Sequence, residues 1–283
     1  MKRILKWVGT GLGGLLALVL VAAAVLFVLG SRSLGAAHAV TPNSLDIEAD
    51  SASVANGAHL ASIYGCVDCH GADLSGQEMG DAPPFRLVAS NLTPAGVTAG
   101  YTATDWDRAI RHGVRPDGSA LFVMPAGAYN KISDEEAADL IAYLQTLPPV
   151  ESEFERIEWK PMGRILAGGP IDVGKGVHTS SPPASAPPPD STVAYGEYVA
   201  SMMCAYCHGP ELRGQEVEGS EIPAPDLRAS AAWSRAQFHE TLTTGVTPAG
   251  REMNPEVMPW TSTARMTVAE REGLRRYLLT LDS

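Results

Sequence analysis

The sequence predicts an all-α protein: one long apolar helix, followed by two copies of a small helical unit. Residues 7–31 contain no charged side chain, the rest of the chain repeats with a period of about 135 residues, and each copy closes with a helical apolar pattern. Strand signals are nearly absent. The expected parts are an apolar helix in 1–32, a connection in 33–51, the first unit in 52–150, a proline-rich linker in 151–192 and the second unit in 193–283.

The apolar run at the amino terminus is long enough to cross a membrane. A helix over residues 7–31 exceeds the ~20 residues that span a ~30 Å hydrocarbon core. Lys2, Arg3 and Lys6 precede it, which predicts a cytoplasmic start and an exported body. A cleavable signal peptide is the alternative, because residues 37–39 read Ala-His-Ala. The run is longer than the ~7 to 15 apolar residues of a signal peptide, which favours an uncleaved, single-pass anchor.

Composition excludes two classes of protein. With 45% hydrophobic residues, the chain is too apolar to be intrinsically disordered. A formal charge of −11 disfavours nucleic acid as a partner, since phosphates must be neutralised by Lys and Arg. We expect the acidic side chains to form a solvated surface suited to a basic partner.

The two copies align through short shared motifs. Between them, the prolines of TSSPPASAPPPDS favour an extended, semi-rigid spacer, and the preceding WKPMGRILAGGP is apolar enough to pack on a domain. A helix is expected before each cysteine motif, over about 57–64 and 196–203. The recurring motifs are CVDCHG at 66–71 and CAYCHG at 204–209, G-V-x-P-x-G at 113–118 and 245–250, and V-M-P at 123–125 and 257–259.

Each copy closes with a helix that is amphipathic and capped. Ser133 with Glu136, and Thr267 with Glu270, have the S/T-x-x-E pattern of a capping box. Apolar side chains then fall on one helical face. They are Leu140, Tyr143, Leu144 and Leu147 in the first copy, and Leu274, Tyr277, Leu278 and Leu281 in the second.

All four cysteines belong to two C-x-x-C-H motifs. This pattern is the requirement for covalent attachment of haem c, because two thiols reach the vinyl groups on one porphyrin edge and the histidine reaches the iron. A zinc knuckle or a thioredoxin-like redox pair also uses C-x-x-C, but neither explains the adjoining histidine twice. The sequence therefore predicts two covalent haems c. The attachment and proximal-ligand residues are Cys66, Cys69 and His70, then Cys204, Cys207 and His208.

Met124 and Met258 are the candidates for the second iron ligand of each haem. Each lies in V-M-P just before the closing helix. A thioether favours Fe(II) and raises the reduction potential, while proline stiffens the loop that presents it. Core packing is the alternative role of a methionine. That role is expected for those that do not recur, Met79, Met202, Met203 and Met266, and Met253 is a rival to Met258 without the proline.

Five further histidines do not recur at equivalent positions, whereas two aromatic residues do. Trp106 and Phe238 both precede the G-V-x-P-x-G motif, and we expect them to pack at the haem edge or in the core. The histidines are expected at the surface or in local hydrogen bonds. They are His38, His59, His112, His178 and His239.

On these motifs the chain resembles membrane-anchored, multihaem c-type cytochromes with class I cytochrome c domains, and it is similar to the cytochrome c subunit of quinoprotein alcohol dehydrogenases. The resemblance covers the two repeated units and rests on CVDCHG, SNLTP at 90–94, WDRAIRHGVRPDG at 106–118 and MPAGAYNKISDEEAADLIAYL at 124–144. It implies His/Met-ligated haems on the periplasmic side of a bacterial cytoplasmic membrane. It also implies that Asn91 and Thr93 touch a haem propionate, in place of a role as a glycosylation site. Those dehydrogenase subunits have three haem domains, whereas this chain has two and its second copy lacks the NLTP element.

The resulting hypothesis is an electron-transfer protein, not an enzyme. Its haems would accept single electrons from a dehydrogenase or a quinol-oxidising complex and deliver them to a terminal oxidase or a soluble cytochrome. A di-haem peroxidase and a haem-based gas sensor are the alternatives, and both require an open iron site. Methionine candidates in both copies argue against them.

Overall fold

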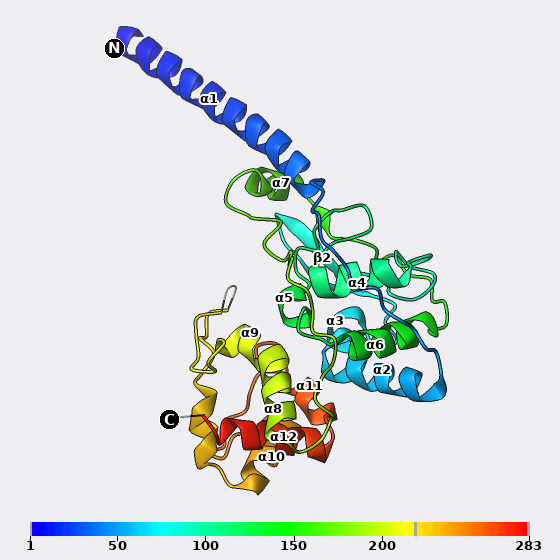
Figure 1. The fold of residues 1–283 in the computed structure, drawn as a ribbon. Coiled ribbons are helices and arrows are strands. Elements are labelled where there is room, and N and C mark those ends of the chain that lie inside the picture. The colour runs from blue at the N-terminus through cyan, green and yellow to red at the C-terminus, as the bar shows by residue number, and fades with distance from the viewer. Residues whose placement is uncertain (1, 218–219, 282–283) are drawn as a thin grey trace.

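The computed structural model describes residues 2–217 and 220–281. A long helix, α1 (Lys2–Leu34), projects from a body of two small, mainly helical domains (Figure 1). Helix α7 (Pro161–Ala167) lies at the end of α1 where the body begins. Among the described residues, α1 is the helix long and apolar enough to cross a membrane, as the sequence predicted.

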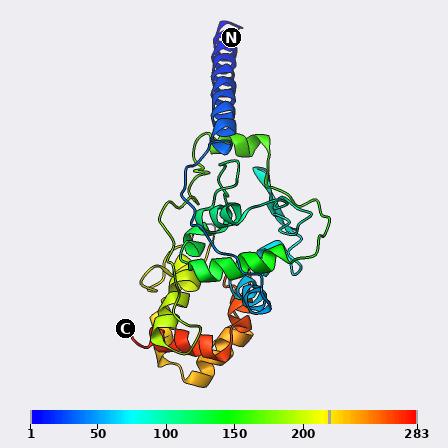
Figure 2. The same cartoon turned by 45° about the vertical axis from the view of Figure 1, so that its right-hand side comes forward.

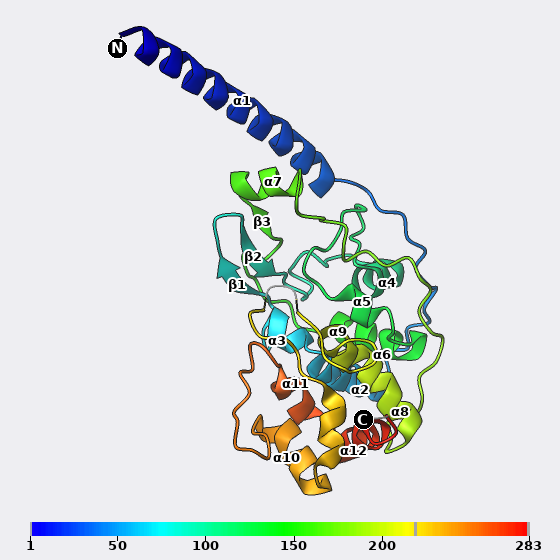
Figure 3. The ribbon, with the colours of Figure 1, turned by 90° about the vertical axis from the view of Figure 1, so that its left-hand side faces the viewer.

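The two domains repeat one order of helices. Domain 1 lies next to α1, and domain 2 lies on the side of domain 1 away from α1 (Figure 3). The helices of domain 1 are α2 (Ser51–Ile63), α3 (Cys66–His70), α4 (Ala103–His112), α5 (Ala126–Tyr129) and α6 (Asp134–Gln145). Those of domain 2 are α8 (Val193–Val199), π-helical η1 (Ala200–Cys204), α9 (Ala205–His208), 3₁₀-helical η2 (Leu227–Ala232), α10 (Arg235–Thr244), α11 (Trp260–Arg265) and α12 (Val268–Leu278).

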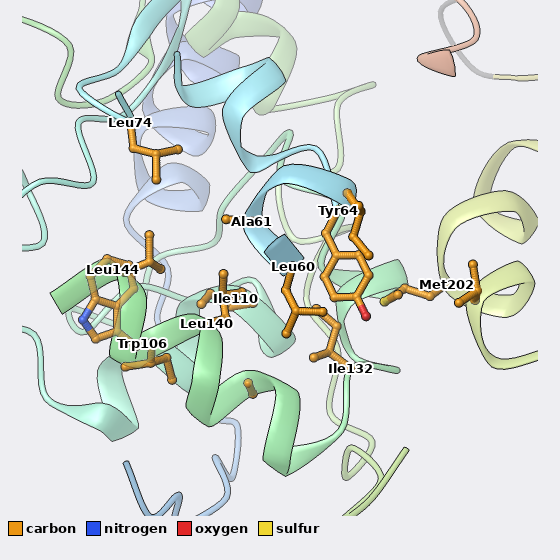
Figure 4. Packing of buried hydrophobic residues seen from close by; sticks show 14 of the residues in the cluster. Leu60, Ala61, Tyr64, Leu74, Trp106, Ile110, Ile132, Leu140, Leu144 and Met202 are labelled. Atoms are coloured by element: carbon orange, nitrogen blue, oxygen red, sulfur yellow. The ribbon is translucent and has the colours of Figure 1, made fainter. Parts of the chain in front are cut away.

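In each domain the first and last helices cross at a glycine. A Cβ added to Gly57 of α2 would stand 2.0 Å from the carbonyl oxygen of Asp139 in α6. A Cβ on Gly196 of α8 would stand 2.0 Å from the carbonyl oxygen of Gly273 in α12. The absence of a side chain therefore lets the helices approach closely enough to bury the predicted apolar faces, as Figure 4 shows for domain 1. The buried leucines are Leu140, Leu144, Leu274 and Leu278.

The chain reaches its two cysteine motifs by different routes. In domain 1, α2 ends and Gly65, with φ of 79°, turns the chain into α3. In domain 2, α8 runs through the π-helical turn η1 directly into α9. A glycine in the left-handed backbone conformation and a π-helical turn both change the direction of the chain. Each does so just before the same motif.

Domain 1 also contains a small antiparallel sheet. Strand β1 (Gln77–Asp81) pairs with β2 (Phe85–Ala89), and β3 (Glu158–Trp159) pairs with the other edge of β2. The expected near absence of strands is wrong here. β1 is polar and largely exposed, and β3 is only two residues long, so neither gives the alternating apolar pattern of a half-buried strand.

The segment between the domains packs along domain 1. The ring of Trp159 lies 5.4 Å from that of Phe85 and 5.1 Å from that of Phe122, centroid to centroid. Further along, the Pro183 carbonyl accepts a hydrogen bond of 3.0 Å from the Asp134 N–H at the start of α6. Part of the proline-rich stretch is therefore fastened to domain 1.

The two domains contact each other through corresponding residues. His59 of α2 lies 2.9 Å from Glu270 of α12, measured from Nε2 to Oε1. Tyr198 of α8 occupies the place of His59 after the crossing glycine, and its hydroxyl donates to Glu136 of α6. Each domain thus sends a side chain from its first helix to the acidic residue at the start of the other domain's last helix.

A second pair of contacts also joins corresponding residues of the two domains. Lys131, just before α6, donates from Nζ to the Ser201 carbonyl at 2.6 Å. Arg265, just before α12, donates from Nε to the Ser62 carbonyl at 3.0 Å. Contacts that interchange when the domains are swapped are those of an isologous, twofold interface, here formed within one chain.

The interface also explains why one predicted capping box is incomplete. At α12, Thr267 accepts from the Glu270 N–H and donates its own N–H to the Glu270 carboxylate, so the box is complete. At α6, Ser133 accepts from the Glu136 N–H, but its own N–H donates at 3.0 Å to the hydroxyl of Tyr198, and that hydroxyl donates to the Glu136 carboxylate. The box predicted at Ser133 is therefore only half formed, because the hydroxyl of a domain 2 residue lies between the cap N–H and the carboxylate.

The His59–Glu270 contact predicts a pH-dependent contribution to stability. The hydrogen bond to Glu270 raises the pKa of His59. Burial alone would raise the pKa of Glu270, but hydrogen bonds from His59 and the Thr267 N–H outweigh it and lower that pKa. The contribution should be full between about pH 4.5 and 6.5, the ordinary values of the two groups. It should decline as pH rises through the raised pKa of His59 or falls through the lowered pKa of Glu270.

The size of this effect should be below about 1 kcal/mol, because the His59 side chain is 29% exposed to solvent. Denaturant midpoints of the haem-loaded protein, measured against pH, should show it in the wild type and lose it in His59→Gln. Tyr198→Phe is the matched control at the corresponding position, and it should keep the pH dependence. Identical pH profiles for the wild type and His59→Gln would contradict the assignment.

Candidate haem sites

A deep pocket in domain 1 brings its four predicted site residues together. Cys66, Cys69 and His70 reach it from α3, and Met124 reaches it from the loop before α5. Its empty volume is about 1200 Å³, including the open mouth. The wall is completed mainly by aliphatic and aromatic side chains, among them Leu92, Trp106, Ile110, Tyr129, Leu140 and Leu144. Two distant motifs thus converge on one apolar pocket.

The histidine of each C-x-x-C-H motif is held with one ring nitrogen free. Nδ1 of His70 lies 2.7 Å from the carbonyl oxygen of Ser90, and Nδ1 of His208 lies 2.8 Å from that of Pro225. A carbonyl can only accept, so Nδ1 carries the proton and Nε2 keeps its lone pair for a metal ion. Burial lowers the pKa of both imidazoles, which favours the neutral form that ligates iron.

The loops that supply these carbonyls fold alike in both domains. Leu74 and Leu212 follow the histidines, are buried and have positive φ angles of 60° and 56°. Each accepts a hydrogen bond of 2.9 Å at its carbonyl, from the N–H of Leu92 and of Leu227 respectively. Leu92 and Leu227 therefore correspond. The second copy replaces the Asn-Leu-Thr-Pro element with another sequence that makes the same backbone contact and then continues as the 3₁₀ helix η2.

Asn91 and Thr93 hold the fold and do not line the pocket. They are 1% and 0% exposed, so the sequon is inaccessible to glycosylation in the folded protein. Nδ2 of Asn91 donates to the Val150 carbonyl at 2.7 Å, Oδ1 accepts from the Thr93 N–H at 2.9 Å, and Thr93 Oγ1 accepts from the Val150 N–H at 3.1 Å. The expected contact with a propionate is not supported, because these polar atoms already have partners. Asp226 of domain 2 likewise accepts from the Arg228 N–H.

Met124 and Met258 have the same backbone setting. Each is followed by a proline at the N-cap of a short helix, α5 or α11. The carbonyl of Met124 accepts from the Ala126 N–H at 2.8 Å, and that of Met258 accepts from the Trp260 N–H at 2.6 Å. The two methionines therefore stand at structurally equivalent points of the two domains.

The other methionines differ from this pair. Met253 takes the place of Leu121, because each donates its N–H to the carbonyl of the glycine that ends the preceding helix. Met202 and Met266 are buried in the core, as predicted. Core packing is wrong for Met79, which is 45% exposed and lies at the pocket of domain 1.

The cysteines are not arranged as a redox pair. All four are described and none forms a disulfide. Burial, followed by the neighbouring cysteine, raises the pKa of the Cys66 and Cys204 thiols to about 12. A reactive C-x-x-C pair requires a lowered thiol pKa, so this setting disfavours the redox alternative.

A basic residue that the sequence did not single out lies at the pocket of domain 1. Arg115 lines this pocket and an adjoining hollow of about 560 Å³, also lined by Arg156. Its guanidinium donates to the Ala120 carbonyl at 2.6 Å and to Ser119 at 3.2 Å. Among the described residues, no carboxylate lies within 4.0 Å of it. Arg115 is the first of the two variable residues of G-V-x-P-x-G. The second copy has Thr247 there, and this difference between the copies could have drawn attention to Arg115.

Known families match both halves of the body. Residues 54–148 match the family model described as cytochrome c, and residues 191–278 match the model described as cytochrome c oxidase, cbb3-type, subunit III. The chain contains two cytochrome c domains. Domains of this type carry covalently bound haem c and transfer electrons.

Relatives of the chain include cytochrome subunits of dehydrogenases and a diheme cytochrome. It is 32% identical over 217 residues to the cytochrome c subunit of alcohol dehydrogenase (quinone) from Gluconacetobacter polyoxogenes, covering 70% of this chain and 44% of the relative. It is 28% identical over 258 residues to a diheme cytochrome c-type protein from Cereibacter sphaeroides, covering 76% and 81% respectively. A fructose dehydrogenase cytochrome subunit from Gluconobacter japonicus is 34% identical over 109 residues, or 35% of this chain and 22% of that subunit.

The chain thus spans less than half the length of the first of these relatives. All three are named as cytochromes or cytochrome subunits, which supports the prediction of an electron carrier in place of a catalytic enzyme.

The residues present in domain 1 fit a haem c. Two thiols, an imidazole with a free Nε2 and a thioether line one apolar pocket, which is the donor set of a His/Met haem. Arg115, which has no carboxylate within 4.0 Å in the part of the chain that the structure describes, lies where it could meet an acidic edge of the group. Domain 2 repeats the histidine setting and the methionine setting, with Thr247 in place of Arg115.

Replacing Asn91 with Ala should destabilise domain 1 without changing its haem. The substitution removes the buried amide that bonds to the Val150 carbonyl, which should cost about 1–3 kcal/mol. Denaturant midpoints should fall, while potentiometric titration should find the reduction potential unchanged. Thr104→Ala, on the exposed face of α4, is the control for stability. A shifted potential with unchanged stability would instead indicate contact between Asn91 and the haem.

Proposed function

We propose that this chain is a di-haem c-type cytochrome that relays single electrons on the periplasmic face of a bacterial cytoplasmic membrane. The observation that carries the proposal is the duplicated ligand setting. Each domain has a C-x-x-C-H helix whose histidine keeps Nε2 free, and a Met-Pro loop in the same conformation. When bound, the haem supplies reversible one-electron chemistry, while the protein supplies ligands, a dry pocket and surface charge.

Each domain would hold one haem through two thioether bonds and two iron ligands. Methionine as the second ligand raises the reduction potential. Two protein ligands per iron leave no open site, which favours a relay over the di-haem peroxidase and the gas sensor. The residues proposed are Cys66, Cys69, His70 and Met124 in domain 1, and Cys204, Cys207, His208 and Met258 in domain 2.

Contacts between the domains support electron transfer within one chain. Asp68 lies between the two cysteines of domain 1, and it accepts hydrogen bonds from Ser262 and Arg265 of α11, the helix after the methionine loop of domain 2. On the other side, Lys131 follows α5 and contacts Ser201, just before Cys204. Each attachment segment therefore meets the methionine side of the other domain. An electron could cross this interface without any movement of the linker.

The proposed partners are redox proteins of a respiratory chain. The donor would be a dehydrogenase or a quinol-oxidising complex, and the acceptor a terminal oxidase or a soluble cytochrome. The names of the relatives support a dehydrogenase, and the charge of −11 supports a partner with a basic surface. Val123 and Val257, each next to a proposed methionine ligand, are exposed and offer apolar contact at the corresponding place on both domains.

Substituting Met124 or Met258 with Ala should test the relay assignment. Loss of the sulfur ligand should lower the reduction potential of the haem in that domain, remove the weak absorption band of Fe–S(Met) coordination and open its iron to carbon monoxide. The wild type should bind no carbon monoxide and turn over no peroxide. Met253→Leu is the control within domain 2. Peroxidase activity with a high-spin haem in the wild type would favour the enzyme alternative, and unchanged spectra in both alanine variants would refute the ligands.

Arg115 is proposed to pair with a propionate of the haem in domain 1. A positive charge beside a haem disfavours Fe(III), so Arg115→Gln should lower the potential of this haem and leave the other unchanged. The reciprocal change, Thr247→Arg, should raise the potential of the haem in domain 2. Redox titration of each variant measures both haems, and Arg213→Gln, on the exposed surface, is the control. Equal shifts in Arg115→Gln and Arg213→Gln would contradict a direct pairing.

A further inference from the structure

Helix α7 packs backbone to backbone against the outer end of α1. Figure 2 shows α7 lying across the end of α1, between it and the rest of domain 1. A Cβ added to Gly30 would stand 1.7 Å from the carbonyl oxygen of Arg164, and one added to Gly168 would stand 2.0 Å from that of Leu26. Such close approach at two glycines fixes the position of α7 relative to α1.

This contact lies where the apolar run of α1 ends. At 1.5 Å per residue, Leu26 lies about 28 Å along the helix from Trp7, close to the ~30 Å of a hydrocarbon core. The preceding side chains of α1 are exposed to their surroundings, as those of a helix in lipid would be. The first charged residue beyond the run is Arg32. Helix α7 is therefore held at the level where the outer headgroups would begin.

The side chains of α7 suit that level. Met162 is 49% exposed, and Ile165 and Leu166 are partly exposed. The guanidinium of Arg164 lies over the ring of Phe27, 6.0 Å from its centroid. Apolar side chains beside an arginine that keeps its charge at the boundary are typical of helices that lie in a membrane interface.

The opposite side of α7 is fastened to domain 1. A Cβ added to Gly163 would stand 2.0 Å from the Pro84 carbonyl oxygen, just before β2. Lys160, which precedes α7, forms an ion pair with Asp81 of β1. Leu87 of β2 lines the haem pocket. A continuous set of packed elements thus joins α1 to the wall of that pocket.

We propose that α7 and its flanking residues, 159–170, dock on the outer surface of the lipid bilayer. The proposal rests on the membrane anchor of the proposed function and gives a role to the apolar stretch WKPMGRILAGGP. The bilayer is the expected partner because α7 packs across the end of α1, the helix that crosses the membrane in the proposed function. Domain 1 would then contact the bilayer directly. Its distance from the membrane surface would be fixed and would not vary through a flexible linker. The bilayer needs no particular headgroup, since the exposed side chains of α7 are mainly apolar.

Depth-dependent quenching tests this docking. The full-length, haem-loaded protein is placed in phosphatidylcholine nanodiscs with a bimane probe on a cysteine introduced by Met162→Cys, Leu18→Cys or Val268→Cys. The probe at 18, inside α1, should be quenched by nitroxide-labelled lipid. The probe at 268, on the exposed surface of α12, should be quenched only by aqueous iodide. The fluorescence of the probe at 162 should be quenched by the nitroxide-labelled lipid, as that of the probe at 18 is.

The outcomes distinguish the docking of α7 on the bilayer from the insertion of α1 in the membrane. A probe at 162 that responds to iodide as the probe at 268 does, while the probe at 18 responds to lipid, overturns the docking and leaves the anchor standing. That result is also expected if another membrane protein, absent from the nanodisc, normally covers α7. A probe at 18 that does not respond to lipid overturns the anchor and the docking together.

A glycine substitution tests whether α1 holds α7 in place. In the Met162→Cys background, Gly30→Leu should move the probe from lipid to water, because the Arg164 carbonyl leaves no room for a side chain. Gly13→Leu is the matched control in the same helix, since no atom lies within 4 Å of a Cβ there. An unchanged probe in Gly30→Leu would show that the packing of α1 on α7 does not set its depth.

Discussion

The hydrogen bond from each C-x-x-C-H histidine to a backbone carbonyl is the contact on which both sites depend. It fixes which ring nitrogen carries the proton and leaves Nε2 available for iron. To deliver that carbonyl, the loop after each motif must turn back beneath the histidine. It does so through Leu74 and Leu212, two buried residues held at positive φ. The strain at these leucines is tolerated because the returning chain is bonded to their carbonyls.

Duplication accounts for how the two domains meet. Two copies of one fold present the same surface, so they can pair as the halves of a symmetric dimer do. The copies have since diverged at the contact itself, with His59 on one side and Tyr198 on the other. Burial raises the pKa of Tyr198 further above neutral pH. Of these two side chains, His59 is therefore the one whose ordinary pKa lies near neutral pH.

Local patterns in the sequence predicted the helices, the haem attachment motifs and the methionine loops, because each of these is set by residues close together in the chain. Features that depend on distant partners could not be predicted. The half-formed cap at Ser133 depends on Tyr198 of the other domain, and the burial of Asn91 depends on Val150. Arg115 shows its role only once the pocket exists, since its sequence signal is a single difference from Thr247.

The two domains differ in their distance from α1 and in the presence of Arg115, and both differences bear on the direction of electron flow. Domain 1 lies next to α1 and domain 2 lies away from it (Figure 1). Arg115, which we propose to pair with the haem of domain 1, has no counterpart in domain 2, and a cation beside a haem raises its reduction potential. Electrons would then move from domain 2 toward domain 1, that is, toward the membrane. Under the proposed periplasmic placement, this direction suits a donor that reaches domain 2 from the periplasm and an acceptor embedded in the membrane beside α1. A seated domain 1 and a fixed interface between the domains would keep both haems in place for that transfer.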